Sequence, residues 1–285
     1  MDHKPSFSVN EAGTLFHDFA SGDAGDTVDF FQRASQLPLK DACRKFIELA
    51  GERTTSSPHL KLYQAPPAEI KPKPSLPEFW VGTADEIRRL AILRNIGREG
   101  LMAASERGLL RFAKLRDTTA WIVTDASRLN AQARRLDGQL WEHIGAKAWT
   151  LPTSLASWPI GIMEAQTSRI IALCEGAPDF LAAHYLMLWE GVQCSPVAML
   201  GASQRIHVDA LPLFAGKRVR IFGHDDVAGR GAVLRWAAQL ATVGAKVDAF
   251  SFAGLQQEDG KPVKDLNDSL LMDVKSFTRV EKILP

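Results

Sequence analysis

Three groups of acidic residues lie in the second half of the 285-residue sequence, each after a short apolar segment. Glu175 opens Glu-Gly-Ala-Pro-Asp, Asp225 and Asp226 follow His224, and Asp265 lies within Lys-Asp-Leu-Asn-Asp. Clustered carboxylates repel one another, so a protein that keeps such a cluster usually neutralises it with a cation. Oxygen ligands in this number favour Mg²⁺ or Mn²⁺, and an ion held in this way is suited to phosphoryl transfer.

The segments around these groups predict a parallel sheet. Predicted strands and helices alternate along this part of the chain: strands over 169–174, 196–200, 218–222 and 246–252, with the clearest helices over 178–190 and 228–243. Strand, helix, strand at intervals of about twenty-five residues is typical of βαβ units with helices on both faces of the sheet. Ligands in such folds bind beyond the carboxyl ends of the strands, so the three acidic groups are expected at one edge.

Each acidic group also has an ordinary structural interpretation. Glu175 to Asp179 fits a strand end followed by a helix cap, and an acidic pair before Ala228 and Gly229 fits a turn. Lys-Asp-Leu-Asn-Asp alone fits a helix N-terminus. The order of the three groups, each after a predicted strand, favours a shared site.

The rest of the chain divides by composition. Residues 1–51 contain predicted strands at 6–9 and 15–19, glycine turns, and an amphipathic helix over 38–50. Residues 52–78 are rich in proline and predict an extended linker. Residues 79–160 predict a mixed α+β subdomain that begins with a capping box, Thr83 and Glu86, and 161–285 form the parallel-sheet domain.

Basic residues concentrate in one segment of an otherwise neutral chain. The whole sequence has 34 basic and 33 acidic side chains, which excludes a bulk polycation, whereas 86–116 has eight basic and three acidic ones. A stripe of this kind, with Phe112 and Trp121 to stack on bases, suits single-stranded nucleic acid. A solvated helix face with paired charges is the alternative interpretation. Arg88 and Arg111 are candidate contacts, whereas the other tryptophans in 80–158 predict packing.

Composition narrows the remaining classes. The sequence is 46% hydrophobic, and its three separated cysteines exclude a disulfide scaffold and a cysteine-built zinc site. No apolar run reaches about 18 residues and no secretory signal is visible, so a cytoplasmic protein without a membrane partner is expected. No Gly-x-x-x-x-Gly-Lys-Ser/Thr loop is present, which excludes a P-loop ATPase.

The acidic elements carry a family resemblance. Glu175–Asp179 and the later Asp-Asp-Val-Ala-Gly-Arg element resemble the TOPRIM domain shared by DnaG-type primases, topoisomerases and some nucleases. Lys264–Asp268 looks like the third acidic element of the primase branch. Ala131–Gly138, together with Lys147, is similar to the basic polymerase-core subdomain of primases. The implied fold is α/β: a TOPRIM-type parallel sheet flanked by helices, after a mixed α+β subdomain.

The N-terminal module is similar to the zinc ribbon of the same enzymes, but it lacks the ligands. The family's second ligand pair falls at Asp18 and Ser21, and no cysteine lies near His3. Zinc needs four ligands at tetrahedral spacing, so we expect no zinc, with His3 and His17 as bystanders. Either the chain begins inside the motif or this lineage has dispensed with zinc. The expected ribbon-shaped core is aromatic: Phe7, Phe16, Phe19 and Phe30.

A second departure lies at the acidic pair. Alignment on Ala228-Gly229 places the family's two aspartates at His224 and Asp226. Histidine is a softer ligand than carboxylate and favours Mn²⁺ over Mg²⁺. Alternatively Asp225 takes the lost role, or the metal site is weakened and the domain only binds nucleic acid.

The resemblance implies a primase-like nucleotidyltransferase of phage or plasmid type. It would make short RNA primers on single-stranded DNA from nucleoside triphosphates, with Mg²⁺ or Mn²⁺, and a separate replicative helicase is a further implied partner. Glu175 would be general base or metal ligand, and Asp226 would hold ions together with Asp225 or His224. Asp265 would complete the acidic rim.

The resemblance also implies basic residues that contact the substrates, and it leaves two alternative functions open. Arg134 and Lys147 would neutralise triphosphate or template, and Lys264 is a further candidate contact. A nucleic-acid-binding TOPRIM protein without catalysis and a metal-dependent nuclease are the alternatives.

Overall fold

The computed structural model describes residues 7–10, 13–18, 23–49, 77–280 and 282–285. It divides into one unit over 1–70 and another over 71–285, and each is treated by itself. The predicted linker, 52–78, lies almost wholly outside the described residues, as do His3, Phe19 and Ser21. Among the described helices, none has the length and apolar character needed to cross a bilayer.

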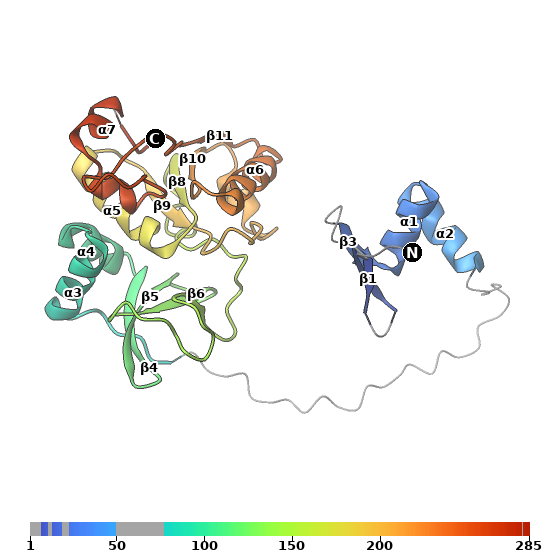
Figure 1. Ribbon diagram of the computed structural model, residues 1–285, viewed down its shortest axis with the longest axis horizontal. Helices are drawn as coiled ribbons and strands as arrows, with labels where there is room; N and C mark the ends of the chain where they lie inside the picture. The colour runs from blue at the N-terminus through green and yellow to red at the C-terminus, as the bar shows by residue number, and fades with distance from the viewer. Residues whose placement is uncertain (1–6, 11–12, 19–22, 50–76, 281) are drawn as a thin grey trace. The chain divides into compact units, whose positions relative to one another are not determined.

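The first unit joins an antiparallel sheet to a helix pair (Figure 1). Its elements are β1 (Phe7–Val9), β2 (Leu15–Asp18), β3 (Asp23–Asp26), α1 (Thr27–Ser35) and α2 (Leu39–Leu49). The predicted first two strands and the helix α2 are confirmed. Strand β3 replaces an expected glycine turn, and α1 was not expected. Asp26 begins α1, accepting from the backbone N–H groups of Val28 and Asp29, while the Asp29 carboxylate accepts from the Asp26 N–H.

Aromatic rings fill the space between this sheet and α1. The ring centroids of Phe7, Phe16 and Phe30 lie 5.4–5.6 Å apart, in the range of favourable aromatic pairs. Phe16 is buried, whereas Phe7 and Phe30 are 44% and 46% exposed. The three described members of the expected aromatic core therefore do meet.

The second unit begins with two helices packed on an antiparallel sheet. Its first elements are α3 (Ala84–Arg94), α4 (Arg98–Glu106), β4 (Leu110–Leu115), β5 (Thr118–Thr124), β6 (Ala131–Arg135) and β7 (Trp149–Thr150), with strand order β4-β5-β6-β7. Thr83 and Glu86 form the expected capping box at the start of α3. Phe112 and Trp121 face each other across β4 and β5 and are fully buried. The prediction that they stack on bases is therefore wrong, because both rings form core.

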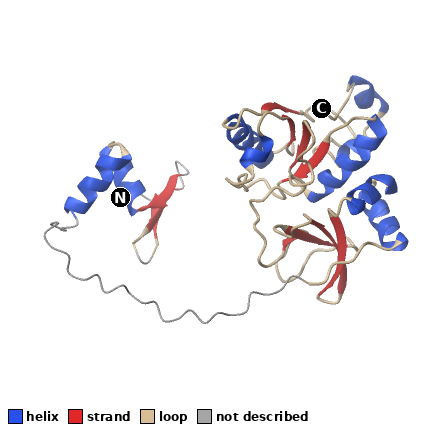
Figure 2. Ribbon diagram, turned by 180° about the vertical axis from the view of Figure 1, so that it is seen from behind, coloured by secondary structure: helices blue, strands red, loops and turns tan. Residues whose placement is uncertain are grey.

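A parallel sheet follows, with helices on both sides (Figures 1 and 2). Its elements are β8 (Ile170–Cys174), α5 (Ala177–Glu190), β9 (Ser195–Ala198), η1 (Leu211–Phe214), β10 (Arg218–Phe222), α6 (Val227–Ala241), β11 (Lys246–Ala249), η2 (Asp268–Leu271) and α7 (Val274–Arg279). The strand order is β11-β10-β8-β9, and every pairing is parallel. The predicted α/β sheet flanked by helices is confirmed.

Alternation along β8 explains why both faces need a helix. Ala172 and Cys174 pack into the core that includes α5, whereas Ile171 and Leu173 pack into the core that includes α6. Successive strand residues point to opposite faces, so an apolar strand of this kind requires cover on both.

Close contact between α4 and α5 joins the antiparallel and parallel sheets into one compact unit. A Cβ atom on Gly100 would lie 2.5 Å from the Cα of Tyr185, and one on Gly97 would lie 2.1 Å from its ring. Arg107 donates to Nε2 of the fully buried His184 at 2.9 Å, and His184 Nδ1 lies 2.8 Å from the Phe180 carbonyl oxygen. Burial and the neighbouring guanidinium lower the pKa of His184 to about 3, so the ring is neutral, with Nδ1 donating.

Leucines on the two sides of α6 give a test of this packing. Leu240 is fully buried, and Leu234 on the same helix is 74% exposed. We expect Leu240→Ala to lower the free energy of unfolding by about 2–5 kcal/mol, because it removes apolar contacts and leaves a cavity. Leu234→Ala should change it by no more than about 0.5 kcal/mol. Urea denaturation measures both, and equal effects would contradict the placement of α6.

Candidate metal and nucleotide site

The carboxyl edge of the parallel sheet brings the predicted residues together. Glu175 directly follows β8, and His224 lies two residues beyond β10. These strands are parallel neighbours in which Phe222 pairs with Cys174, so both side chains emerge at the same edge. The first turn of α5 adds Asp179.

His224 lies between two buried carboxylates. Its backbone N–H donates to Glu175 Oε2 at 3.0 Å, and its Nδ1 lies 3.3 Å from Glu175 Oε1. Its Nε2 lies 2.9 Å from Asp179 Oδ2. Gly229 fixes this backbone, because a Cβ atom there would lie 2.2 Å from the His224 carbonyl oxygen. The imidazole thus bridges the strand end and the helix start.

Burial and neighbouring charges together determine the pKa values of the site residues. Burial disfavours the charged ring, but the hydrogen bond with Asp179 and the charges of Asp179, Glu175 and Asp265 raise the pKa of His224 to about 9. Burial raises the pKa of Glu175, in spite of the hydrogen bond from the His224 N–H. Burial and the charge of Asp179 raise the pKa of Asp265 to about 7. At neutral pH the ring of His224 is therefore a cation among the carboxyl groups of Glu175, Asp179 and Asp265.

A loop after β11 completes a possible metal site. The Asn267 N–H donates to Asp179 Oδ1 at 3.1 Å, and the Asp225 N–H donates to the Lys264 carbonyl at 2.7 Å. These bonds bring in Asp265, so that ligand atoms of Asp179, His224 and Asp265 all lie within 4.8 Å of one another. Two carboxylates and an imidazole suit a divalent ion of the Mn²⁺ or Mg²⁺ class once the ring gives up its proton. We call Glu175, Asp179, His224 and Asp265 the acidic cluster.

The neighbouring aspartates have other partners. Asp226 begins α6, and its Oδ1 accepts from the Gly229 N–H at 2.7 Å. Its charge contributes to the raised pKa of Glu175, so it lies at the same edge. Asp225 forms an exposed ion pair with Arg230 at 3.0 Å. The ligand atoms that lie within 4.8 Å of one another belong to Asp179, His224 and Asp265, whereas Asp226 caps α6 and Asp225 pairs with Arg230.

Two arginines from the antiparallel subdomain approach the acidic cluster. The guanidinium carbons of Arg94 and Arg134 lie 5.5 and 5.9 Å from the ring centroid of buried Trp121. Burial lowers the pKa of both, that of Arg134 to about 10, while the charges of Asp179 and Asp265 oppose the shift. In the described structure the buried Nε atoms of both have no hydrogen-bond partner. The two guanidinium groups place positive charge beside the buried carboxylates.

The remaining predicted basic contacts are dispersed. Arg88 pairs with Asp85 at 2.6 Å, and Arg111 donates to the carbonyls of Ser105 and Leu110. Together with the inward positions of Arg94 and Arg107, these contacts break up the expected stripe. Lys147 and Lys264 are exposed.

Sequence reasoning missed Asp179 as a ligand and Arg94 as part of the site. Asp179 follows Glu175 by four residues, a spacing that fits a strand end and the first turn of the next helix, and this signal was readable. Arg94 is the last residue of α3, and its carbonyl accepts from the Asn267 side chain at 2.8 Å. This contact spans 173 residues and has no local signal.

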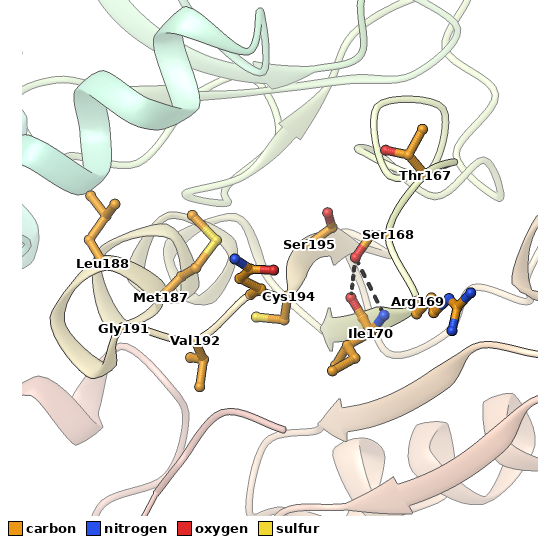
Figure 3. Close-up of a pocket in the computed structure, with 11 residues that line it drawn as sticks. Thr167, Ser168, Arg169, Ile170, Met187, Leu188, Gly191, Val192, Cys194 and Ser195 are labelled. Carbon is orange, nitrogen blue, oxygen red and sulfur yellow. Dashed lines mark hydrogen bonds between the residues drawn. The ribbon is translucent and has the colours of Figure 1, made fainter.

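A separate cavity lies at the opposite edge of the parallel sheet, away from the acidic cluster (Figure 3). It measures about 790 Å³ and opens beside the starts of β8 and β9, where Ser168 Oγ donates to the Ile170 carbonyl at 2.8 Å. Burial and the charge of Glu190 raise the pKa of the Cys194 thiol there to about 12. The thiol is thus held protonated, so this cavity offers no activated cysteine nucleophile.

Comparison with known proteins finds likeness only among solved structures, because no family model and no curated protein matches. The chain is similar to the primase fragment of the bacteriophage T7 primase-helicase protein, with 15% identity over 92% of this chain and 88% of that chain, and a TM-score of 0.44. The zinc-binding and RNA polymerase domains of the Aquifex aeolicus primase are similar with 16% identity over 87% of this chain and 70% of that chain, and a TM-score of 0.38. The RNA polymerase domain of Mycobacterium tuberculosis primase DnaG is similar with 18% identity over 69% of this chain and 70% of that chain, and a TM-score of 0.38.

The bridge at His224 predicts an unusual titration. In metal-free protein the imidazole should titrate near pH 9, so its contribution to stability is complete below about 6.5 and is lost as the pH rises through 9. Asp179→Asn should lower this pKa, because it removes the largest favourable partner. Histidine NMR signals followed against pH measure it. The exposed Asp259→Asn is the matched control, and a wild-type pKa near 6.5 would contradict the bridge.

Proposed function

We propose that this chain is a metal-dependent nucleotidyltransferase of the primase type, which joins ribonucleotides on a single-stranded DNA template. The observation that carries the proposal is the position of the acidic cluster at one sheet edge with Arg94 and Arg134 beside it. Carboxylates that hold a divalent ion, together with cations that contact phosphate, are the parts that phosphoryl transfer requires.

The proposed roles follow from burial and charge. Asp179, His224 and Asp265 hold the divalent ion, which supplies charge neutralisation at the transferred phosphate. Arg94 and Arg134, whose charges lie near those of Asp179 and Asp265, bind the triphosphate. Glu175, whose pKa burial raises, accepts the proton of the attacking hydroxyl.

His224 makes metal binding compete with a proton. Its Nε2 is engaged with Asp179 at 2.9 Å, so an ion can use this nitrogen only after the ring loses its charge. The proposed enzyme thus binds its metal more tightly as the pH rises toward 9. The same nitrogen donor favours Mn²⁺ over Mg²⁺.

Primer synthesis tests this function. We expect the full chain, given single-stranded DNA, Mn²⁺ and labelled ribonucleoside triphosphates, to make short RNA. Glu175→Gln and Asp265→Asn should each lower the rate by about a hundredfold or more, because the first removes the proton acceptor and the second removes a ligand of the ion. The control is Asp259→Asn, whose side chain pairs with Lys261 on an exposed surface.

The outcome separates catalysis from simple binding. Absence of primers with wild-type protein would contradict the proposal, and so would full activity of both site variants. Nicking of plasmid DNA without nucleotides would instead favour a nuclease.

One observation favours a second candidate, a nucleic-acid-binding protein without catalysis. His224 places its own positive charge between Glu175 and Asp179, which neutralises part of the cluster without a metal ion. This candidate predicts equal affinity for single-stranded DNA with and without EDTA, measured by fluorescence anisotropy. Arg134→Ala should weaken binding in both media, because it removes a phosphate contact. A large loss of affinity in EDTA would exclude it.

A further inference from the structure

A cavity of about 330 Å³ lies beside the acidic cluster. It shares His224 and Asp225 with the sheet edge, and it continues between the first turns of α6 and the segment after β11. Its volume falls in the lower part of the range of small-molecule sites. The cavity therefore borders the acidic cluster at His224.

The walls offer flat aromatic and aliphatic surface. Phe250 lines the cavity, and its ring centroid lies 5.7 Å from Phe222 and 4.9 Å from Phe252, so neighbouring rings hold it in place. Phe250 is only partly buried, and Val233 and Leu234 of α6 add the aliphatic side. A fixed aromatic ring with aliphatic neighbours is a surface on which a nucleobase packs without sequence preference.

The rim carries a polar pair suited to a sugar. Asp225 Oδ1 accepts from Arg230 Nη1 at 3.0 Å, and both residues line the cavity. A carboxylate held in this way can accept hydrogen bonds from vicinal ribose hydroxyls, as acidic residues do in other nucleotide sites. Ser251 adds a further exposed hydroxyl.

We infer that this cavity binds the base and ribose of a ribonucleotide whose phosphates lie on the acidic cluster. The phosphate part of this inference rests on the proposed function, whereas the base and ribose part rests on the cavity alone. Asp225 is then a residue that selects ribose, rather than a metal ligand. Asp225 pairs with Arg230 at the rim, whereas His224 contacts Asp179 in the cluster.

Calorimetric titration of the full chain in Mn²⁺ tests the inference with three probes: ATP, dATP and inorganic tripolyphosphate. ATP should bind at least about tenfold more tightly than tripolyphosphate, because the base and ribose add contacts. ATP should bind about three- to tenfold more tightly than dATP, because the 2′-hydroxyl adds a hydrogen bond.

Two variants separate base from sugar. Ser251→Trp should fill the cavity and bring ATP down to the affinity of tripolyphosphate, whereas tryptophan at the exposed Val208, which is outside the cavity, should not. Asp225→Asn should remove the preference for ATP over dATP. Its matched control is Asp259→Asn, another aspartate in an exposed ion pair. Asp225 is exposed, so this variant should fold even where Ser251→Trp does not.

Equal affinity of the wild type for ATP and tripolyphosphate overturns the inference, and it leaves the proposed function intact. Retention of ribose preference in Asp225→Asn overturns the role of that residue. Binding of ATP without any binding of Mn²⁺ or tripolyphosphate supports the cavity and contradicts the proposed metal chemistry.

Discussion

Buried negative charge is the constraint around which the second unit is built. Glu175 and Asp179 are 6% and 1% exposed, and a carboxylate withdrawn from water to this extent needs a compensating positive group. The fold supplies that charge from different directions. His224 comes from the neighbouring strand, and Arg94 and Arg134 come from the antiparallel subdomain. The parallel sheet and the close packing of α4 on α5 make this convergence possible.

The character of the site follows from which cation balances the carboxylates. An imidazolium is fixed in place by backbone and side-chain bonds, whereas a divalent ion can exchange and can bind phosphate at the same time. A protein that has histidine at this position holds a partly neutralised cluster at neutral pH and a more negative one at higher pH. In the proposed function, the proton on His224 therefore competes with the metal ion for this edge.

Local patterns predicted the elements well and their contacts less well. Apolar segments located the strands of the parallel sheet, and Thr83 with Glu86 located the start of α3, because these signals lie within a few residues. Helix α1 was not predicted because its capping pair, Asp26 and Asp29, follows a glycine-containing segment that predicts turns. The positions and partners of Arg94, Arg111 and Trp121 depend on packing between distant segments, and local charge and hydropathy patterns do not predict such packing. The acidic cluster was predicted in part, since topology placed Glu175, His224 and Asp265 at one edge, whereas Asp179 in the first turn of α5 was missed.

The contact of Gly97 and Gly100 with Tyr185 has a genetic consequence. Neither glycine touches the acidic cluster, yet each leaves no room for a methyl group against α5. A larger residue there would push α4 away from α5 and would carry the arginine-bearing subdomain with it. A substitution at either glycine would thus alter the site while every charged residue in it remained unchanged.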